Sequence, residues 1–172
     1  NALNDSSFET QSTDYYDKYL NDLRKGNFVE AILDIEEGLT ETQIYKIGVT
    51  HANDARDAAS SEFPNDVMLR DSFRHFVWNH MSTSDSQVGK VITRTATINH
   101  EWGIILLTPL ENHYTNSYND YKGMGYSDSL AAQEAFADTV AYIPQLKYMT
   151  VEACEGNYDF FKAIFTVSNI MD

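Results

Sequence analysis

Hydrophobic residues recur at intervals of three and four positions along most of the chain, which is the spacing of one face of an α-helix. The spacing predicts helices over residues 14–25, 27–37, 66–81 and 88–102. Between residues 40 and 61 it predicts two shorter helices with a break near Gly48. The sequence lacks the alternation of a half-buried strand. The pattern therefore predicts an all-α fold, a single-domain irregular helical bundle of roughly seven to nine helices.

A capping signal marks one helix start in the second half of the chain. Thr108 is expected to be the N-cap, with Pro109 at the first helical position and Glu111 at the third. A threonine N-cap followed three residues later by a glutamate is the capping-box pattern, and proline is favoured at the first position. The signal predicts a helix that begins there and runs to Tyr121.

Glycine and proline set the remaining boundaries. Gly123 and Gly125 predict a loop over residues 122–129. An alanine-rich helix is predicted over residues 130–142, and Pro144 is expected to end it because proline lacks the backbone N–H that a helix interior needs. A last helix is predicted over residues 158–170. Residues 1–13 are interpreted as a polar leader and residues 14–172 as one helical domain.

Charge narrows the classes of partner. The 172 residues carry a formal net charge of −14, with 42% hydrophobic and 13% aromatic residues. This hydrophobic content is typical of a folded, soluble domain, and no apolar run reaches the length of a membrane-spanning helix. An acidic surface without a basic cluster disfavours nucleic acid and anionic membranes, and suits a basic protein partner. Cys154 is the single cysteine, so an intramolecular disulfide and a thiolate metal cage are excluded.

The first residue is Asn1 and not methionine. Together with the polar stretch that follows, this is typical of a mature chain from which an export signal or lipoprotein leader has been removed. We therefore expect an exported protein, which is periplasmic, secreted or lipid-anchored.

The helix over residues 66–81 carries the main candidate site. At about 100° per residue, one sector of this helix holds four polar or amphipathic side chains: Asp71, Arg74, His75 and Trp78. The opposite side is predicted to be apolar, with Leu69, Phe73, Phe76 and Val77, and with His80 in a structural role. Asp71 and His75 at i, i+4 can hydrogen-bond to each other or bind one metal ion. The alternative is a satisfied polar network or a salt-bridged surface.

The next helix supplies His100 and Glu101 near its end. If the two helices pack antiparallel across the loop at residues 82–87, these side chains come close to Asp71 and His75. Two imidazoles and two carboxylates suit either a general acid/base pair or a Zn²⁺ site with His75, His100 and Asp71 as ligands. Alternatively, Glu101 pairs with Arg94.

A third candidate group lies on the helix that follows Pro109. Its asparagines are spaced i, i+4 and i+7, at Asn112, Asn116 and Asn119. Asparagine is a poor helix former, so these residues are candidates for binding a polar substrate or the histidines of neighbouring helices. A solvated polar face is the alternative. His113 is a further candidate ligand, and His51 is assigned no role.

Three segments together resemble a bacterial family of uncharacterised domains. They are D-S-F-R-H-F-V-W-N at residues 71–79, N-H-E at residues 99–101 and N-H-Y-T-N at residues 112–116. The family pattern is D-x-F-R-H-x-x-W, then H-E, then paired asparagines. The resemblance covers the middle third of the chain and implies a helical, often exported domain. It departs in one place, because Glu111 stands near where the family has an aspartate.

The leading hypothesis from the sequence is a hydrolase-like site. His75 or His100 acts as general base or metal ligand. Asp71 and Glu101 orient the histidines or bind the metal ion. Arg74 binds an anionic or polarised group of the substrate, which is an ester or phosphoester and either a small molecule or lipid-like, while Trp78, Asn112 and Asn116 contact the substrate. The rival hypotheses are a non-catalytic binding or scaffold module and an acidic immunity-type protein that caps a basic partner.

Overall fold

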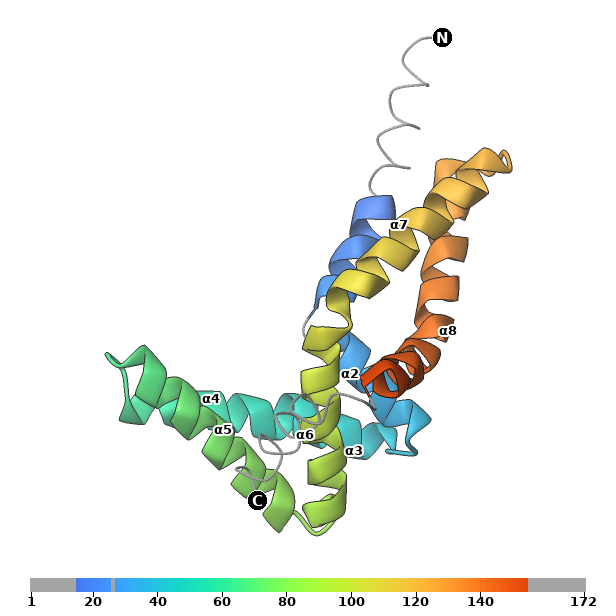
Figure 1. The fold of residues 1–172 in the computed structure, drawn as a ribbon. Helices are drawn as coiled ribbons and strands as arrows, with labels where there is room; N and C mark the ends of the chain where they lie inside the picture. Colours follow the sequence, from blue (N-terminus) through green and yellow to red (C-terminus); the bar gives the residue numbers. More distant parts are fainter. Residues whose placement is uncertain (1–14, 26, 155–172) are drawn as a thin grey trace. The chain divides into compact units, whose positions relative to one another are not determined.

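A computed structural model describes residues 15–25 and 27–154 of the chain. Within these residues the secondary structure is helical and includes no strand, which confirms the predicted all-α class. A helix over residues 15–24 is followed by α2 (Phe28–Glu36), α3 (Glu41–Tyr45), the π-helical turn η1 (Lys46–His51), α4 (Ala52–Glu62), α5 (Val67–Ser84), α6 (Gly89–Ile105), α7 (Leu107–Gly123) and α8 (Asp128–Cys154) (Figure 1). The predicted leader at residues 1–13 and the helix at residues 158–170 lie outside the described part.

The described residues group into two compact units. Of the described residues, the first unit holds 15–32, apart from residue 26, and 102–152, and the second holds 33–101 and 153–154. The single domain predicted over residues 14–172 stays a prediction. No helix in the described ranges has both the length and the apolar character that crossing a bilayer requires.

Aromatic side chains build the core of the first unit. Tyr114 of α7 is fully buried and packs with Leu23 and Ala135. Its ring stacks on Tyr16 at a centroid distance of 5.1 Å, and its hydroxyl donates a hydrogen bond of 3.0 Å to the Tyr16 carbonyl. Burial raises the pKa of the Tyr114 hydroxyl well above its usual value. α7 and α8 lie side by side after the short turn that joins them (Figure 1).

The second unit has its own apolar cluster. Its buried members come from η1, from α6 and from the connections that precede α3 and α6: Leu39, Ile47, Val88 and Ala96, with Trp78 packed against them. α4 packs along α5, and Phe63 meets Phe73 edge-on at a centroid distance of 5.4 Å. The pairing of α4 with α5 is the part of the fold that positions the candidate site.

The break predicted near Gly48 is a wide turn inside a continuous helical segment. η1 joins α3 to α4 without a loop, and its backbone follows the π-helical pattern. Single π-turns are common at functional or strained positions of helices. The start of this segment is capped by Thr40 and Gln43, which form a reciprocal capping box.

The capping box predicted at Thr108 is wrong. The N-cap of α7 is Leu106, which has no side-chain cap. The N–H of Leu106 bonds to the Trp102 carbonyl at 2.9 Å, and the N–H of Leu110 bonds to the Leu106 carbonyl at 3.0 Å. Because α6 runs directly into α7, the preceding turn supplies backbone acceptors and the threonine side chain is not needed. The continuation of α6 into α7 therefore sets this helix start, and the local capping sequence at Thr108 does not.

Pro144 does not end its helix, contrary to the prediction. α8 extends from Asp128 to Cys154 with Pro144 inside it. A proline in a helix interior removes one backbone hydrogen bond and crowds the carbonyl four residues earlier. Packing of the residues around it, including the fully buried Ile143, holds the helix together.

Replacing Pro144 with alanine should therefore stabilise the protein. Restoring the missing N–H and relieving the crowding should raise the free energy of unfolding by about 1–3 kcal/mol in urea titration. The control is Pro64→Ala, because Pro64 lies between α4 and α5 and outside any helix. A loss of stability in Pro144→Ala would contradict a continuous α8.

Candidate functional site

α5 begins at a well-formed cap and exposes a face that the sequence predicted to be buried. The Asp66 side chain accepts a hydrogen bond of 2.9 Å from the N–H of Leu69. Leu69 and Phe76 are 52% and 67% exposed, so the predicted apolar inner face is wrong at these positions. The buried residues of α5 are instead Asn79 and Ser82. α5 therefore packs through its polar and aromatic side.

Trp78, predicted to contact substrate, lies against the core of the second unit. Its indole N–H donates a hydrogen bond of 2.7 Å to the carbonyl of Ile47 in η1. The buried amide of Asn79 beside it donates to the His75 carbonyl at 3.0 Å and accepts from the Thr97 hydroxyl at 3.2 Å. The bonds to Ile47 and to Thr97, which reach other elements, fix the rotation of α5 about its own axis.

Asp71, Arg74 and His75 form a compact polar corner on α5. Nη2 of Arg74 donates to Oδ1 of Asp71 at 2.6 Å. Nε2 of His75 lies 3.8 Å from Oδ2 of Asp71 and 3.5 Å from Nη2 of Arg74. The helical spacing alone predicted this grouping, because residues three and four apart share one face.

The structure also brings His100 to this corner. The rings of His75 and His100 have centroids 6.5 Å apart, and those of Trp78 and His100 are 6.4 Å apart. Glu101 is close enough for its charge to act on His75. Among the residues that the structure describes, no group of three or more His, Cys, Asp or Glu is placed to hold a metal ion. The zinc site with Asp71, His75 and His100 as ligands stays a prediction.

Burial controls the charge state of His75. Desolvation lowers the pKa of its imidazole, with smaller contributions in the same direction from Arg74 and His100. Asp71 and Glu101 act in the opposite direction but do not outweigh burial. The imidazole is therefore neutral at pH 7 and can accept a proton.

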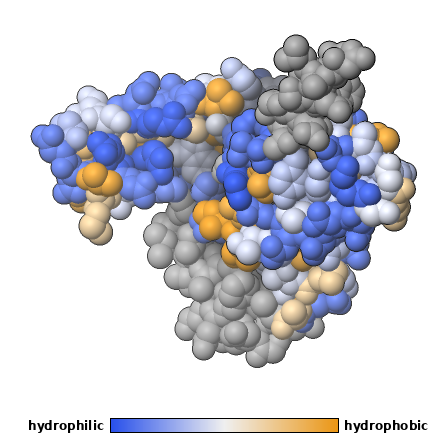
Figure 2. Space-filling view, turned by 90° about the horizontal axis from the view of Figure 1, so that it is seen from above, coloured by the Kyte–Doolittle hydropathy of each residue, from blue (hydrophilic) through white to orange (hydrophobic). Residues whose placement is uncertain are grey.

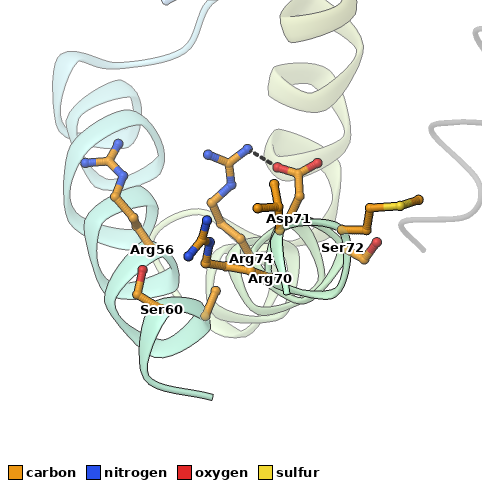
Figure 3. A pocket seen from close by; sticks show the side chains of 9 residues that line it. Arg56, Ser60, Arg70, Asp71, Ser72 and Arg74 are labelled. Atoms are coloured by element: carbon orange, nitrogen blue, oxygen red, sulfur yellow. Dashed lines mark hydrogen bonds and ion pairs between the residues drawn. The ribbon is translucent and has the colours of Figure 1, made fainter. Parts of the chain in front are cut away.

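A pocket of about 470 Å³ opens between α4 and α5 beside this corner. Three arginines line it: Arg56 of α4, and Arg70 and Arg74 of α5. Figure 3 shows these side chains and Ser60 around the space between the two helices, with Arg74 joined to Asp71. The other lining residues are Ala59, Val67, Met68 and Ser72. With three guanidinium groups and one carboxylate, the lining is positively charged.

The sequence analysis did not identify this arginine cluster as a site. Arg70 and Arg74 are spaced i, i+4, which places them on one helix face. Arg56 joins them only because α4 packs along α5, and that contact is tertiary. The i, i+4 spacing of Arg70 and Arg74 is the sequence feature that could have pointed to this site.

The predicted asparagine group belongs to the first unit. Asn112 and Asn116 are exposed on α7. Nδ1 of His113 lies 3.2 Å from the Thr139 hydroxyl oxygen, and its ring stacks on Tyr142 at 4.4 Å. His113 thus helps to join α7 to α8. The substrate-binding role of Asn112 and Asn116 stays a prediction.

His51, assigned no role from the sequence, takes part in an ion-pair cluster. Oδ2 of Asp85 lies 3.0 Å from Nε2 of His51 and 2.9 Å from Nζ of Lys46. Oδ1 of Asp85 accepts a bond of 2.8 Å from the N–H of Gln87. The hydrogen bond from Lys46, followed by that from Gln87, lowers the pKa of Asp85 to about 2. The cluster ties η1 to the loop between α5 and α6.

No protein-family model, curated protein or solved structure matches the chain. The resemblance to an uncharacterised bacterial family stays a prediction.

The lowered pKa of His75 makes stability depend on pH. The unfolded chain binds a proton at this site more readily than the folded chain, so the free energy of unfolding should fall as the pH drops below about 6.5. In urea titrations between pH 7.5 and 5, the free energy of unfolding of a His75→Gln variant should therefore decrease less than that of the parent. His80→Gln on the same helix is the control for replacing a histidine as such. An unchanged pH slope in His75→Gln would contradict the buried, neutral imidazole.

Proposed function

We propose that the second unit binds a small ligand with a phosphate or carboxylate group in the pocket between α4 and α5. The observation that carries the proposal is the gathering of Arg56, Arg70 and Arg74 around one pocket in a chain of net charge −14. The chain has only five arginines, so three of them share this site. An acidic chain has no general reason to concentrate its guanidinium groups.

The hydrogen bonding of these arginines leaves capacity for a ligand. Arg56 bonds to the side-chain carbonyl of Asn53 at 3.3 Å, and Arg70 bonds to the carbonyl of Pro64 at 3.2 Å. Both acceptors are neutral. A guanidinium has five N–H donors in a planar fork that matches carboxylate and phosphate oxygens. An anion in the pocket therefore gains charge-assisted hydrogen bonds and relieves the repulsion among three like charges.

The proposal is tested with inorganic phosphate and sulfate. Calorimetric titration should detect binding, and saturating anion should raise the melting temperature, because a ligand at about 100 times its Kd stabilises the folded state by about 2.7 kcal/mol. Removing one charge-assisted contact by Arg56→Gln or Arg70→Gln should weaken binding by about 10-fold or more.

The matched control is Lys90→Gln, which removes one exposed positive charge from α6 of the same unit. It should bind phosphate as the parent does. Equal losses of phosphate affinity in Lys90→Gln and Arg70→Gln would show that net charge alone causes the effect. This result would overturn the pocket as the binding site.

A second candidate function is hydrolysis of an ester or phosphoester held in this pocket. The observation in its favour is the neutral imidazole of His75, whose Nε2 lies 3.5 Å from the pocket-lining Arg74. In this reaction His75 takes a proton from water as the water attacks the ester. The ester bond breaks, and the proton passes to the leaving alcohol.

Hydrolysis is tested with p-nitrophenyl phosphate and p-nitrophenyl acetate. His75→Gln should lower kcat by about 100-fold or more, which is the usual contribution of a general base, while leaving phosphate affinity unchanged. The rate in the parent should rise with pH through the lowered pKa of His75. Phosphate binding without turnover in the parent would leave the non-catalytic binding module as the function.

A further inference from the structure

We propose that the anion bound in this pocket is the phosphate group of a small polyol phosphate, a molecule that carries hydroxyl groups beside its charged group. The proposal rests on the proposed function, because it assumes that the arginine pocket binds the phosphate. It adds the chemical class of the ligand and the residue that recognises its hydroxyl group. This residue is Asp71, whose carboxylate accepts a hydrogen bond from the ligand.

One face of each helix lines the pocket. On α5, Arg70, Asp71 and Arg74 lie within a sector about 100° wide, so their side chains leave the helix on the same side. On α4, Arg56 and Ser60 are spaced i, i+4 and share the face that lines the pocket from the other helix. The lining therefore combines hydrogen-bond donors from both helices with one carboxylate from α5.

Asp71 is the lining residue that binding of a simple anion does not explain, because its charge repels phosphate. Its Oδ1 atom accepts the hydrogen bond of 2.6 Å from Nη2 of Arg74. Its Oδ2 atom lies 3.8 Å from Nε2 of His75, which is longer than a hydrogen bond, and the Asp71 side chain is 58% exposed. Oδ2 is therefore open to a donor from the ligand.

A hydroxyl group suits this position better than an ammonium group. Both can donate a hydrogen bond to a carboxylate. Three guanidinium groups line the same pocket as the single carboxylate, so the lining repels a second cation. A hydroxyl group donates to Asp71 without this repulsion.

The arrangement of the charged groups orients the ligand. In Figure 3 the guanidinium group of Arg74 lies between that of Arg56 and the carboxylate of Asp71. A phosphate group held between Arg56 and Arg74 therefore leaves the rest of the ligand to extend over Arg74 toward Asp71. The pocket volume of about 470 Å³ is in the usual range of small-molecule sites, and a phosphate ion alone is much smaller than such ligands.

The surroundings favour a hydrophilic ligand. Most of the residues that line the pocket are polar or charged, and the lining residue Ala59 is fully buried. On the face shown in Figure 2, the surface over α4 and α5 is mostly hydrophilic. An alkyl chain would cover polar groups without hydrogen-bonding to them, which costs free energy. The hydroxyl groups of a polyol replace the hydrogen bonds that water makes there.

The test compares two phosphate esters that differ only in their hydroxyl groups. Glycerol 3-phosphate and propyl phosphate have the same carbon chain and the same charged group. Both are titrated into the full chain by calorimetry, beside inorganic phosphate. A hydrogen bond to a carboxylate should make glycerol 3-phosphate bind about 5-fold or more tightly than propyl phosphate. Glycerol, which lacks the phosphate group, should show no binding.

Asp71→Ala should change two affinities in different ways. Inorganic phosphate should bind about 2- to 5-fold more tightly, because the carboxylate that competes for Arg74 is gone. Glycerol 3-phosphate should lose its advantage over propyl phosphate. The matched control is Asp57→Ala, which removes an exposed carboxylate from α4 that does not line the pocket. This control should keep the advantage of glycerol 3-phosphate, and far-UV circular dichroism confirms that both variants are folded.

The outcomes separate the two proposals. Failure of inorganic phosphate and of both esters to bind would overturn the proposed function. Phosphate binding without an advantage for glycerol 3-phosphate would overturn the polyol phosphate alone. Tighter binding of propyl phosphate would overturn it as well and would indicate an apolar ligand. An advantage that persists in Asp71→Ala would overturn Asp71 as the group that recognises the hydroxyl. The two esters in the parent chain decide the ligand class even if Asp71→Ala does not fold.

Discussion

The hydrogen bond from the indole of Trp78 to the carbonyl of Ile47, 2.7 Å long, is the contact on which the geometry of the second unit depends. Ile47 lies in the turn that leads from α3 into α4, so the bond fixes α5 against the segment that continues as α4. Asn79 adds a second restraint through its bond to Thr97 of α6. With α5 held on both sides, its rotation is set, and the face with Arg70 and Arg74 meets Arg56.

This arrangement explains why α5 exposes apolar residues and buries polar ones, contrary to its hydrophobic pattern. The half-buried Trp78 and the buried Asn79 satisfy their polar groups through specific partners, which gives orientation as well as burial. Two large apolar side chains of α5, Leu69 and Phe76, are then left facing outward, whereas Phe73 packs on Phe63. Exposed apolar surface is a cost in water, so the burial of polar groups on α5 is bought with solvent-exposed apolar side chains.

Periodicity was sufficient to predict the fold class and most helices, because helical spacing is a local property of the sequence. It also grouped Asp71, Arg74 and His75, which share one turn. It failed where distant contacts decide: Thr108 lies inside a continuous helical path, and Pro144 is held within α8 by packing. The arginine pocket was missed for the same reason, since Arg56 reaches it only through the pairing of two helices. Local patterns carry no information about which helix lies beside which.

Arg74 links the binding and the catalytic proposals. Its guanidinium lines the pocket, donates to Asp71 at 2.6 Å and lies 3.5 Å from Nε2 of His75. An anion in the pocket competes with Asp71 for this guanidinium. A carboxylate that gives up part of its bond to Arg74 becomes a stronger partner for the nearby imidazole, and this opposes the desolvation that lowers the pKa of His75. Occupancy of the pocket and the basicity of His75 are therefore coupled through one side chain.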